Sequence, residues 1–202
     1  MSRTESTTTL ALGSTAPAFE LLDVISGKAL SRDDIFATSD GTPREGLIVA
    51  FICVHCPFVI HVEQELARIG HDYYGADGEG PIAIVAISSN DIVDYPQDAP
   101  EHMREQAQRL GFTFPYLHDE SQEVAREYDA ACTPDIYFFD PDLRLVYHGQ
   151  LDSSRPKRKD GSGNDIPVDG KDLRAAIEAV IAGNKPSSQQ IPSIGCNIKW
   201  RE

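Results

Sequence analysis

Apolar and polar positions along the chain follow two different periods, which predicts buried strands alternating with helices. Residues 46–52 and 82–87 form short runs that are apolar throughout, as expected for strands buried on both faces of a sheet. Between them, apolar residues recur every three or four positions from Phe58 to Ile69, which is the period of an amphipathic helix. This alternation predicts an α/β fold.

The second half of the chain continues the same alternation. Apolar periodicity, capping residues and glycines predict three further helices, at 101–110, opening at Asp119, and at 171–182. Residues 135–140 and 143–149 are predicted to be two antiparallel strands, because a Pro-Asp turn separates them. The 202 residues show no repeat and no break in composition, so we expect one domain with extensions at its ends.

Charge and composition exclude several classes of partner. The formal net charge is −14, with 32 acidic and 18 basic residues, so the chain repels nucleic acid and anionic membrane surfaces. The longest apolar run, residues 47–53, is far shorter than the roughly 20 residues of a membrane span. Residues 1–12 contain no apolar signal core, and we therefore expect a cytoplasmic protein. In that reducing compartment, cysteines serve as catalytic, sensing or inert thiols more often than as structural disulfides.

Two of the four cysteines lie where the first buried strand gives way to the amphipathic helix. Cys53 and Cys56 form a Cys-x-x-Cys motif that contains His55. Backbone N–H groups and the positive end of the helix dipole stabilise a thiolate at such a place, and a protonated histidine adds positive charge. A zinc site would need two more ligands at short spacing, and the sequence has no second motif of this kind. We therefore predict a redox-active dithiol that uses no metal and no cofactor.

The order of these motifs resembles the thioredoxin fold. A strand enters Cys-x-x-Cys at a helix start, and Thr133-Pro134 later precedes a strand, a hairpin and a closing helix. The opening pattern Gly13-x-x-Ala16-Pro17-x-Phe19 is similar to the start of the alkyl hydroperoxide reductase/thiol-specific antioxidant family, the peroxiredoxin-like branch. The resemblance implies a central mixed sheet flanked by helices. It divides the chain into a flexible N-terminus (1–12), a thioredoxin-like domain with a peroxiredoxin-type N-terminal extension (13–183) and a C-terminal tail (184–202).

Departures from the peroxiredoxin pattern favour disulfide exchange over peroxide reduction. Peroxiredoxins have Thr or Ser three positions before the reactive cysteine. In this chain, the residue three positions before Cys56 is Cys53, and the residue three positions before Cys53 is Ala50. The place six residues before the strand-ending Asp140, where the family has an arginine, holds Pro134. This is the thioredoxin-type proline, which in the family is cis and faces the disulfide.

The resemblance also assigns roles. Cys53 is expected to be the exposed nucleophile and Cys56 the buried resolving thiol, with His55 lowering the pKa of Cys53. A cis Thr133–Pro134 bond, with the ring near the Cys53 sulfur, is expected to leave the Thr133 backbone free to pair with a substrate strand. The oxidised protein is predicted to carry a Cys53–Cys56 disulfide.

The other two cysteines leave alternatives open. Cys132, two residues before Pro134, is expected beside the dithiol, where it accepts the disulfide, helps to bind a metal ion, or is an inert buried thiol, which is the default. Cys196 lies in the tail and could act as a C-terminal resolving cysteine. We favour instead a tail that simply docks on the domain through four apolar residues, Ile191, Ile194, Ile198 and Trp200.

Three functions from different classes follow. The leading one is a thiol–disulfide oxidoreductase that acts on a disulfide-bearing protein or on a small thiol or peroxide substrate. The second is an antioxidant thiol peroxidase with Cys56, or Cys53, as the reactive residue. The third is a non-enzymatic metal carrier. The sequence leaves the reductant and the oligomeric state open, a homodimer included.

Overall fold

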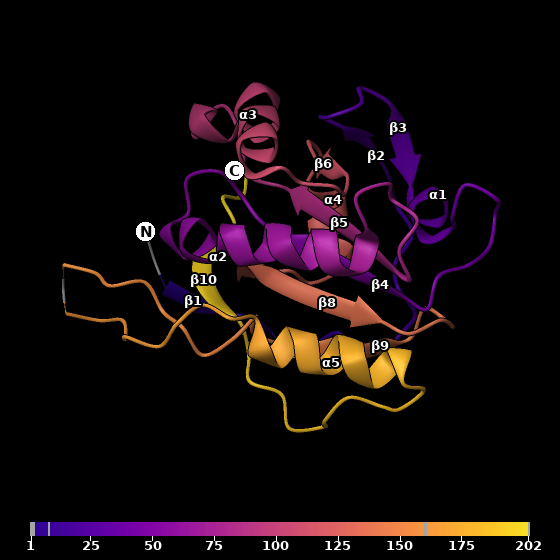
Figure 1. The fold of residues 1–202 in the computed structure, drawn as a ribbon. Helices are drawn as coiled ribbons and strands as arrows, with labels where there is room; N and C mark the ends of the chain where they lie inside the picture. Colours follow the sequence, from indigo (N-terminus) through magenta and orange to yellow (C-terminus); the bar gives the residue numbers. More distant parts are fainter. Residues whose placement is uncertain (1–2, 8, 160, 202) are drawn as a thin grey trace.

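The computed structural model describes residues 3–7, 9–159 and 161–201, and it has the expected α/β architecture (Figure 1). Over these residues, seven strands form one mixed sheet in the order β3-β2-β6-β5-β4-β8-β9. They are β2 (Glu20–Asp23), β3 (Ala29–Ser31), β4 (Gly46–Phe51), β5 (Ile82–Ser88), β6 (Tyr116–His118), β8 (Asp135–Phe139) and β9 (Leu145–His148). β4 runs parallel to β5 and antiparallel to β8, and β8 pairs with β9 in the antiparallel hairpin that we predicted.

Different helices cover the two faces of this sheet. Alternating residues of β4 point to two separate cores, as the period of a strand dictates. One core is closed by α2 (Pro57–Ile69), α3 (Pro100–Leu110) and α5 (Lys171–Ile181), and the other by α1 (Arg32–Phe36) and α4 (Glu123–Glu127). Figure 1 shows α2 and α5 crossing the same face of the sheet. The prediction of a central mixed sheet flanked by helices is confirmed.

One helix start differs from the prediction. α4 begins at Glu123, four residues after the expected start at Asp119. The Asp119 side chain instead accepts the N–H of Ala125 at 3.0 Å and the hydroxyl of Ser89 at 2.9 Å, which holds the preceding turn against the loop after β5. The described residues also contain two short helices, the π-helix η1 (Gly70–Tyr74) and the 3₁₀-helix η2 (Pro96–Asp98).

The two ends of the chain meet in a second, smaller sheet. In the described residues it has three antiparallel strands, with β10 (Ile194–Asn197) between β1 (Arg3–Glu5) and β7 (Cys132–Thr133). β1 lies within the segment 1–12 that we expected to be flexible, and residues 1, 2 and 8 of that segment lie outside the described part. The flexibility and the domain boundaries stay predictions. The small sheet joins the tail to the segment before Pro134.

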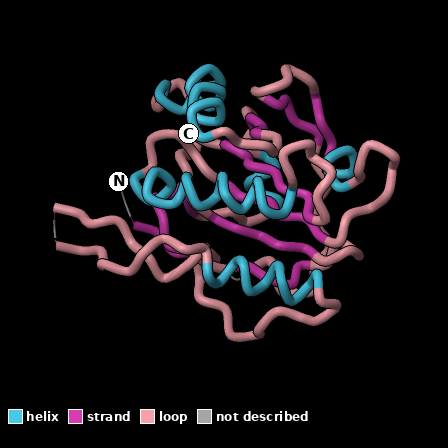
Figure 2. The backbone as a smooth tube through the Cα atoms, viewed as in Figure 1, coloured by secondary structure: helices cyan, strands magenta, loops and turns pink. Residues whose placement is uncertain are grey.

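Long loops lead to this small sheet (Figure 2). After α5, residues 182–193 return the chain along that helix to β10, as Figure 1 also shows. In the described part of the chain, every helix is too short or too polar to span a membrane.

Candidate active site

Cys53 and Cys56 lie in the turn that joins β4 to α2. Cys56 is the N-cap residue of α2, and Pro57 follows in the first helical turn, where its missing N–H costs no helical hydrogen bond. Both cysteines are buried, with exposed fractions of 1% for Cys53 and 0% for Cys56. The expectation that Cys53 is exposed is therefore wrong.

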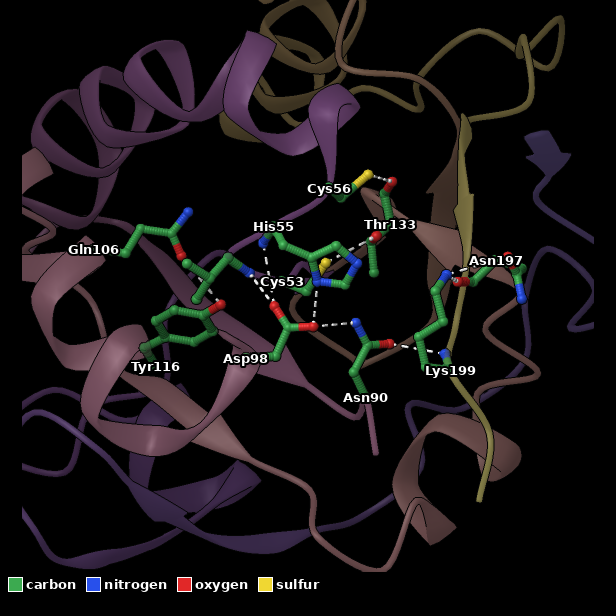
Figure 3. A network of polar contacts seen from close by, with 11 residues as sticks. Cys53, His55, Cys56, Asn90, Asp98, Gln106, Tyr116, Thr133, Asn197 and Lys199 are labelled. Atoms are coloured by element: carbon green, nitrogen blue, oxygen red, sulfur yellow. Dashed lines mark hydrogen bonds and ion pairs between the residues drawn. The ribbon is translucent and has the colours of Figure 1, made fainter. Parts of the chain in front are cut away.

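Thr133 of β7 lies against both thiols, as Figure 3 shows. The Cys53 Sγ is 3.4 Å from the Thr133 Oγ1, and the Cys56 thiol donates to the Thr133 carbonyl oxygen at 3.1 Å. β10 pairs with β7 in turn and places Cys196 opposite Thr133. Two strands thus lie beside the turn, which is the physical reason for the burial of Cys53.

The Thr133–Pro134 peptide bond is cis, as predicted. Pro134 lines a small cavity beside α2, together with Phe58, His61 and Val62. The expected contact between the proline ring and the Cys53 sulfur stays a prediction.

The surroundings of Cys56 favour a thiolate. Its pKa is lowered to about 2, first by a hydrogen bond from the Cys196 thiol and then by one from Cys53. Burial opposes this shift, and further hydrogen bonds from the Thr133 hydroxyl and the Val59 backbone N–H add to it. When protonated, Cys56 donates to the Thr133 carbonyl; when deprotonated, it accepts from these donors at a helix start.

The surroundings of Cys53 have the opposite effect. Its pKa is raised by the hydrogen bond with Cys56, by burial and by the negative charge of Asp98, although the Thr133 hydroxyl acts in the other direction. The lowering of this pKa that we expected from His55 stays a prediction, because the hydrogen bond with Cys56 and burial dominate the shift of Cys53. The thiolate is therefore favoured on Cys56 and not on Cys53.

Asp98, the last residue of η2, organises the dithiol turn. It is fully buried, and its Oδ1 accepts the backbone N–H groups of Val54 at 2.9 Å and His55 at 3.1 Å. Its Oδ2 lies 2.5 Å from the Nδ1 of His55 and accepts from the Nδ2 of Asn90 at 2.8 Å (Figure 3). One carboxylate thus fixes the backbone between the two cysteines and orients the histidine ring.

His55 lies beside both this carboxylate and the Cys53 thiol. Its ring stacks on Tyr95, with the centroids 5.7 Å apart and the planes at 10°. Its Nε2 is buried and has no hydrogen-bond partner among the described residues. A ring nitrogen of His55, the Cys53 Sγ and an Asp98 oxygen all lie within 4.8 Å of one another. A histidine held in this way can accept or release a proton beside Cys53.

The sequence reasoning missed Asp98 and Asn90. Asn90 belongs to the polar run 88–91 that follows β5, and the carboxyl ends of neighbouring parallel strands meet at one edge of a sheet. That rule would have placed Asn90 near the dithiol turn after β4. Asp98 lies in a loop with a single 3₁₀ turn and carries no such signal.

Cys132 and Cys196 lie in different surroundings. Cys132 neighbours Thr133 on β7, so its side chain points to the other face, and its thiol lies 3.6 Å from the Pro134 carbonyl oxygen. Burial raises its pKa far above the usual range. Cys196, on β10, belongs to the same core as Cys53 and Cys56.

The predicted docking of the tail is confirmed, through two of the four anchors that we expected. Ile198 is buried, and Ile194 packs partly against the core that contains the dithiol. Ile191 and Trp200, which we expected to dock as well, are 53% and 37% exposed.

Residues 12–148 match the AhpC/TSA family. The chain belongs to the AhpC/TSA family. The matched segment of this AhpC/TSA protein contains β4, the dithiol turn, α2 and the cis Thr133–Pro134 bond. β10 and Cys196 lie beyond it.

Several solved structures are similar to this chain. An uncharacterized conserved protein from Geobacillus kaustophilus is 47% identical with a TM-score of 0.88, over 100% of this chain and 97% of that one. A hypothetical protein from Sinorhizobium meliloti 1021 is 41% identical with a TM-score of 0.87, over 98% of each chain. The thioredoxin domain of a thiol-disulfide oxidoreductase from Bacteroides vulgatus shares the fold, at 19% identity and a TM-score of 0.52, over 69% of this chain and 89% of that one. A comparison with curated proteins found no match.

Family membership supports a thioredoxin-like redox function for this AhpC/TSA protein. The site also bears on the metal-carrier hypothesis. Among the described residues, Cys53, His55 and Asp98 are the group whose potential ligand atoms lie within 4.8 Å of one another, and Cys132 is outside it. Both oxygens of Asp98 already accept hydrogen bonds, which an ion would have to displace. The absence of a metal stays a prediction.

Proposed function

We propose that this AhpC/TSA protein is a thiol–disulfide oxidoreductase whose redox centre is the Cys53/Cys56 dithiol. One observation carries the proposal: Cys56 caps the start of α2 and accepts hydrogen bonds that stabilise a thiolate, while the Cys53 thiol contacts it directly. Two cysteines in one turn are close enough to form a disulfide. The substrate is a disulfide-bearing protein or a small disulfide.

The first step is attack by the Cys56 thiolate on the substrate disulfide. A bond forms between the Cys56 sulfur and one substrate sulfur, and the other substrate sulfur leaves as a thiolate. The resemblance to the thioredoxin fold implied Cys53 as the nucleophile. The lowered pKa of Cys56 and the raised pKa of Cys53 support the reverse assignment.

The second step resolves the mixed disulfide. Cys53 loses its proton, attacks the Cys56 sulfur and releases the second substrate thiolate, which takes up a proton. Because the pKa of Cys53 is raised, this step needs a base, and His55 lies within reach with its ring held by Asp98. The substrate disulfide is reduced to two thiols, and the dithiol is oxidised to a Cys53–Cys56 disulfide.

The test compares single serine variants in reduction of insulin disulfides. C56S is expected to abolish the activity, whereas C53S is expected to form a mixed disulfide on Cys56 that Cys53 can no longer resolve. C132S is the matched control, because this cysteine is equally buried but faces away from the dithiol, and it should retain activity.

The reversed pattern, with mixed disulfides trapped by C56S, would return the nucleophile to Cys53. Full activity in both variants would overturn the proposed dithiol. A pH titration of the thiolate absorbance of C53S further separates Cys56 from Cys53 as the nucleophile. We expect the Cys56 thiolate to form at a pH well below the usual cysteine pKa of about 8.5.

One observation also favours peroxide reduction as a second candidate. Cys56 is followed directly by Pro57 at the helix start and carries the favoured thiolate, which could attack a peroxide to give a sulfenate. Cys53 would then form the disulfide and release water. A rate of Cys56 oxidation by hydrogen peroxide that only equals that of a free thiol would exclude this candidate.

A further inference from the structure

The backbone beside the dithiol is already paired within the chain. β10 lies antiparallel to β7, with Cys196 opposite Thr133 and Asn197 opposite Cys132. An extended peptide that adds to a strand edge binds in the same manner, through main-chain pairing. The tail therefore occupies the edge next to the two thiols that a substrate strand would use.

Gly195 makes an unusually close approach at this edge. A Cβ atom at position 195 would lie 1.9 Å from the carbonyl oxygen of Thr133 and 2.5 Å from its carbonyl carbon, which no side chain could tolerate without a shift of the backbone. Glycine allows the two strands to meet. The next residue, Cys196, is thereby brought to Cys56, and the two thiols share a hydrogen bond.

The chain beyond Cys196 is fixed by buried hydrogen bonds. The backbone N–H of Lys199 donates to the Asn90 Oδ1 at 2.8 Å, and its carbonyl oxygen accepts from the Gln122 Nε2 and the Asp91 N–H, each at 2.8 Å (Figure 3 shows the Asn90 contact). Before Cys196, the backbone N–H of Ser193 donates to the Ser6 hydroxyl at 3.0 Å. The position of Cys196 is therefore held on both sides.

The three thiols lie in series. Cys56 accepts a hydrogen bond from the Cys196 thiol and another from the Cys53 thiol. The three sulfurs do not form a compact ligand set, because among the described residues the group whose ligand atoms lie within 4.8 Å of one another is Cys53, His55 and Asp98. A central sulfur with a thiol on each side suits disulfide exchange better than chelation.

We propose that Cys196 is a third redox thiol, which forms a disulfide with Cys56 of the same chain as an alternative to Cys53. This rests on the proposed function. Starting from a mixed disulfide on Cys56, deprotonated Cys196 attacks the Cys56 sulfur; the Cys56–Cys196 bond forms, and the bond to the substrate sulfur breaks. The substrate thiolate takes up the proton that Cys196 lost. Starting from the Cys53–Cys56 disulfide, the same attack forms the Cys56–Cys196 bond and breaks the Cys53–Cys56 bond. Cys53 leaves as a thiolate and takes up the proton that Cys196 lost.

The experiment uses the full chain carrying C53S, reduced and then treated with glutathione disulfide. After alkylation and digestion with trypsin, Cys56, Cys132 and Cys196 fall in three separate peptides, residues 45–68, 127–144 and 175–199. We expect a disulfide cross-link between the peptide with Cys56 and the peptide with Cys196. C53S/C132S should keep this cross-link, and C53S/C196S should stop at glutathione bound to Cys56.

A C53S protein that accumulates glutathione on Cys56 while Cys196 is still alkylated would overturn the inference, and so would a cross-link to Cys132. C53A, with circular dichroism to check its fold, repeats the test if the serine variant does not fold. The wild-type chain separates the two proposals. If it forms the Cys53–Cys56 disulfide but C53S forms no Cys56–Cys196 disulfide, only this inference fails; if it does not react with disulfides at all, the proposed function fails.

Discussion

Replacing Asp98 with alanine removes the acceptor of four hydrogen bonds at once. The donors are the backbone N–H groups of Val54 and His55, the His55 Nδ1 and the Asn90 Nδ2. A buried hydrogen bond is worth about 1 kcal/mol net, and more when one partner is charged. Asp98→Ala is therefore expected to lower the free energy of unfolding by about 4 kcal/mol or more.

Urea unfolding followed by circular dichroism measures this loss. Asp142→Ala is the matched control, because that aspartate is exposed, and surface changes of this kind are usually within about 0.5 kcal/mol. A loss below about 1 kcal/mol for Asp98→Ala would refute the reasoning, because unpartnered buried donors cost at least that much.

Asp98→Asn separates charge from hydrogen bonding. The amide keeps an oxygen for the two backbone N–H groups but removes the negative charge that raises the pKa of Cys53. In a C56S background, the thiolate of Cys53 is expected to form at lower pH than in C56S alone. An unchanged or higher titration midpoint would contradict the account of Asp98.

Two further predictions concern the tail and alkaline pH. Gly195→Ala should push β10 away from Thr133 and speed the reaction of Cys56 with iodoacetamide in the native protein; an unchanged rate would show that the tail does not limit access. Burial raises the pKa of both Cys132 and Tyr137, whose ordinary values are 9.0 and 10.0. As the pH rises, the unfolded chain releases these two protons before the folded chain does. The contribution of the two groups to the free energy of unfolding is therefore fully present below about pH 9 and is lost as the pH rises further. Urea midpoints that stay constant up to about pH 11 would contradict this.

The sheet and the main helices could be predicted because each follows from local periodicity. The apolar runs became β4 and β5, and the helix expected from Phe58 to Ile69 became α2, with Pro57 in its first turn. The start of α4 could not be predicted in this way, because the Asp119 carboxylate caps a turn through contacts with a distant loop. A local sequence signal predicts where a helix begins, unless a tertiary hydrogen bond uses the same side chain.

Only the two motifs of the site could be predicted from the sequence. Cys-x-x-Cys located the dithiol turn, and Thr133-Pro134 located the facing segment with its cis bond. The pKa values of the two thiols also depend on groups far away in the sequence, since Cys196 lowers that of Cys56 and Asp98 adds to the rise in that of Cys53. Such pairings cannot be read from a four-residue motif.

A redox titration of the wild-type chain tests the central claim most directly. The protein is equilibrated with graded ratios of reduced and oxidised dithiothreitol, quenched in acid, alkylated and mapped by mass spectrometry. The account predicts one two-electron transition in which Cys56 passes from thiol to disulfide, with Cys53 as its main partner and Cys132 a thiol throughout. A Cys56 that stays a thiol at every ratio, or that pairs with Cys132, would contradict the claim that this turn is the redox centre.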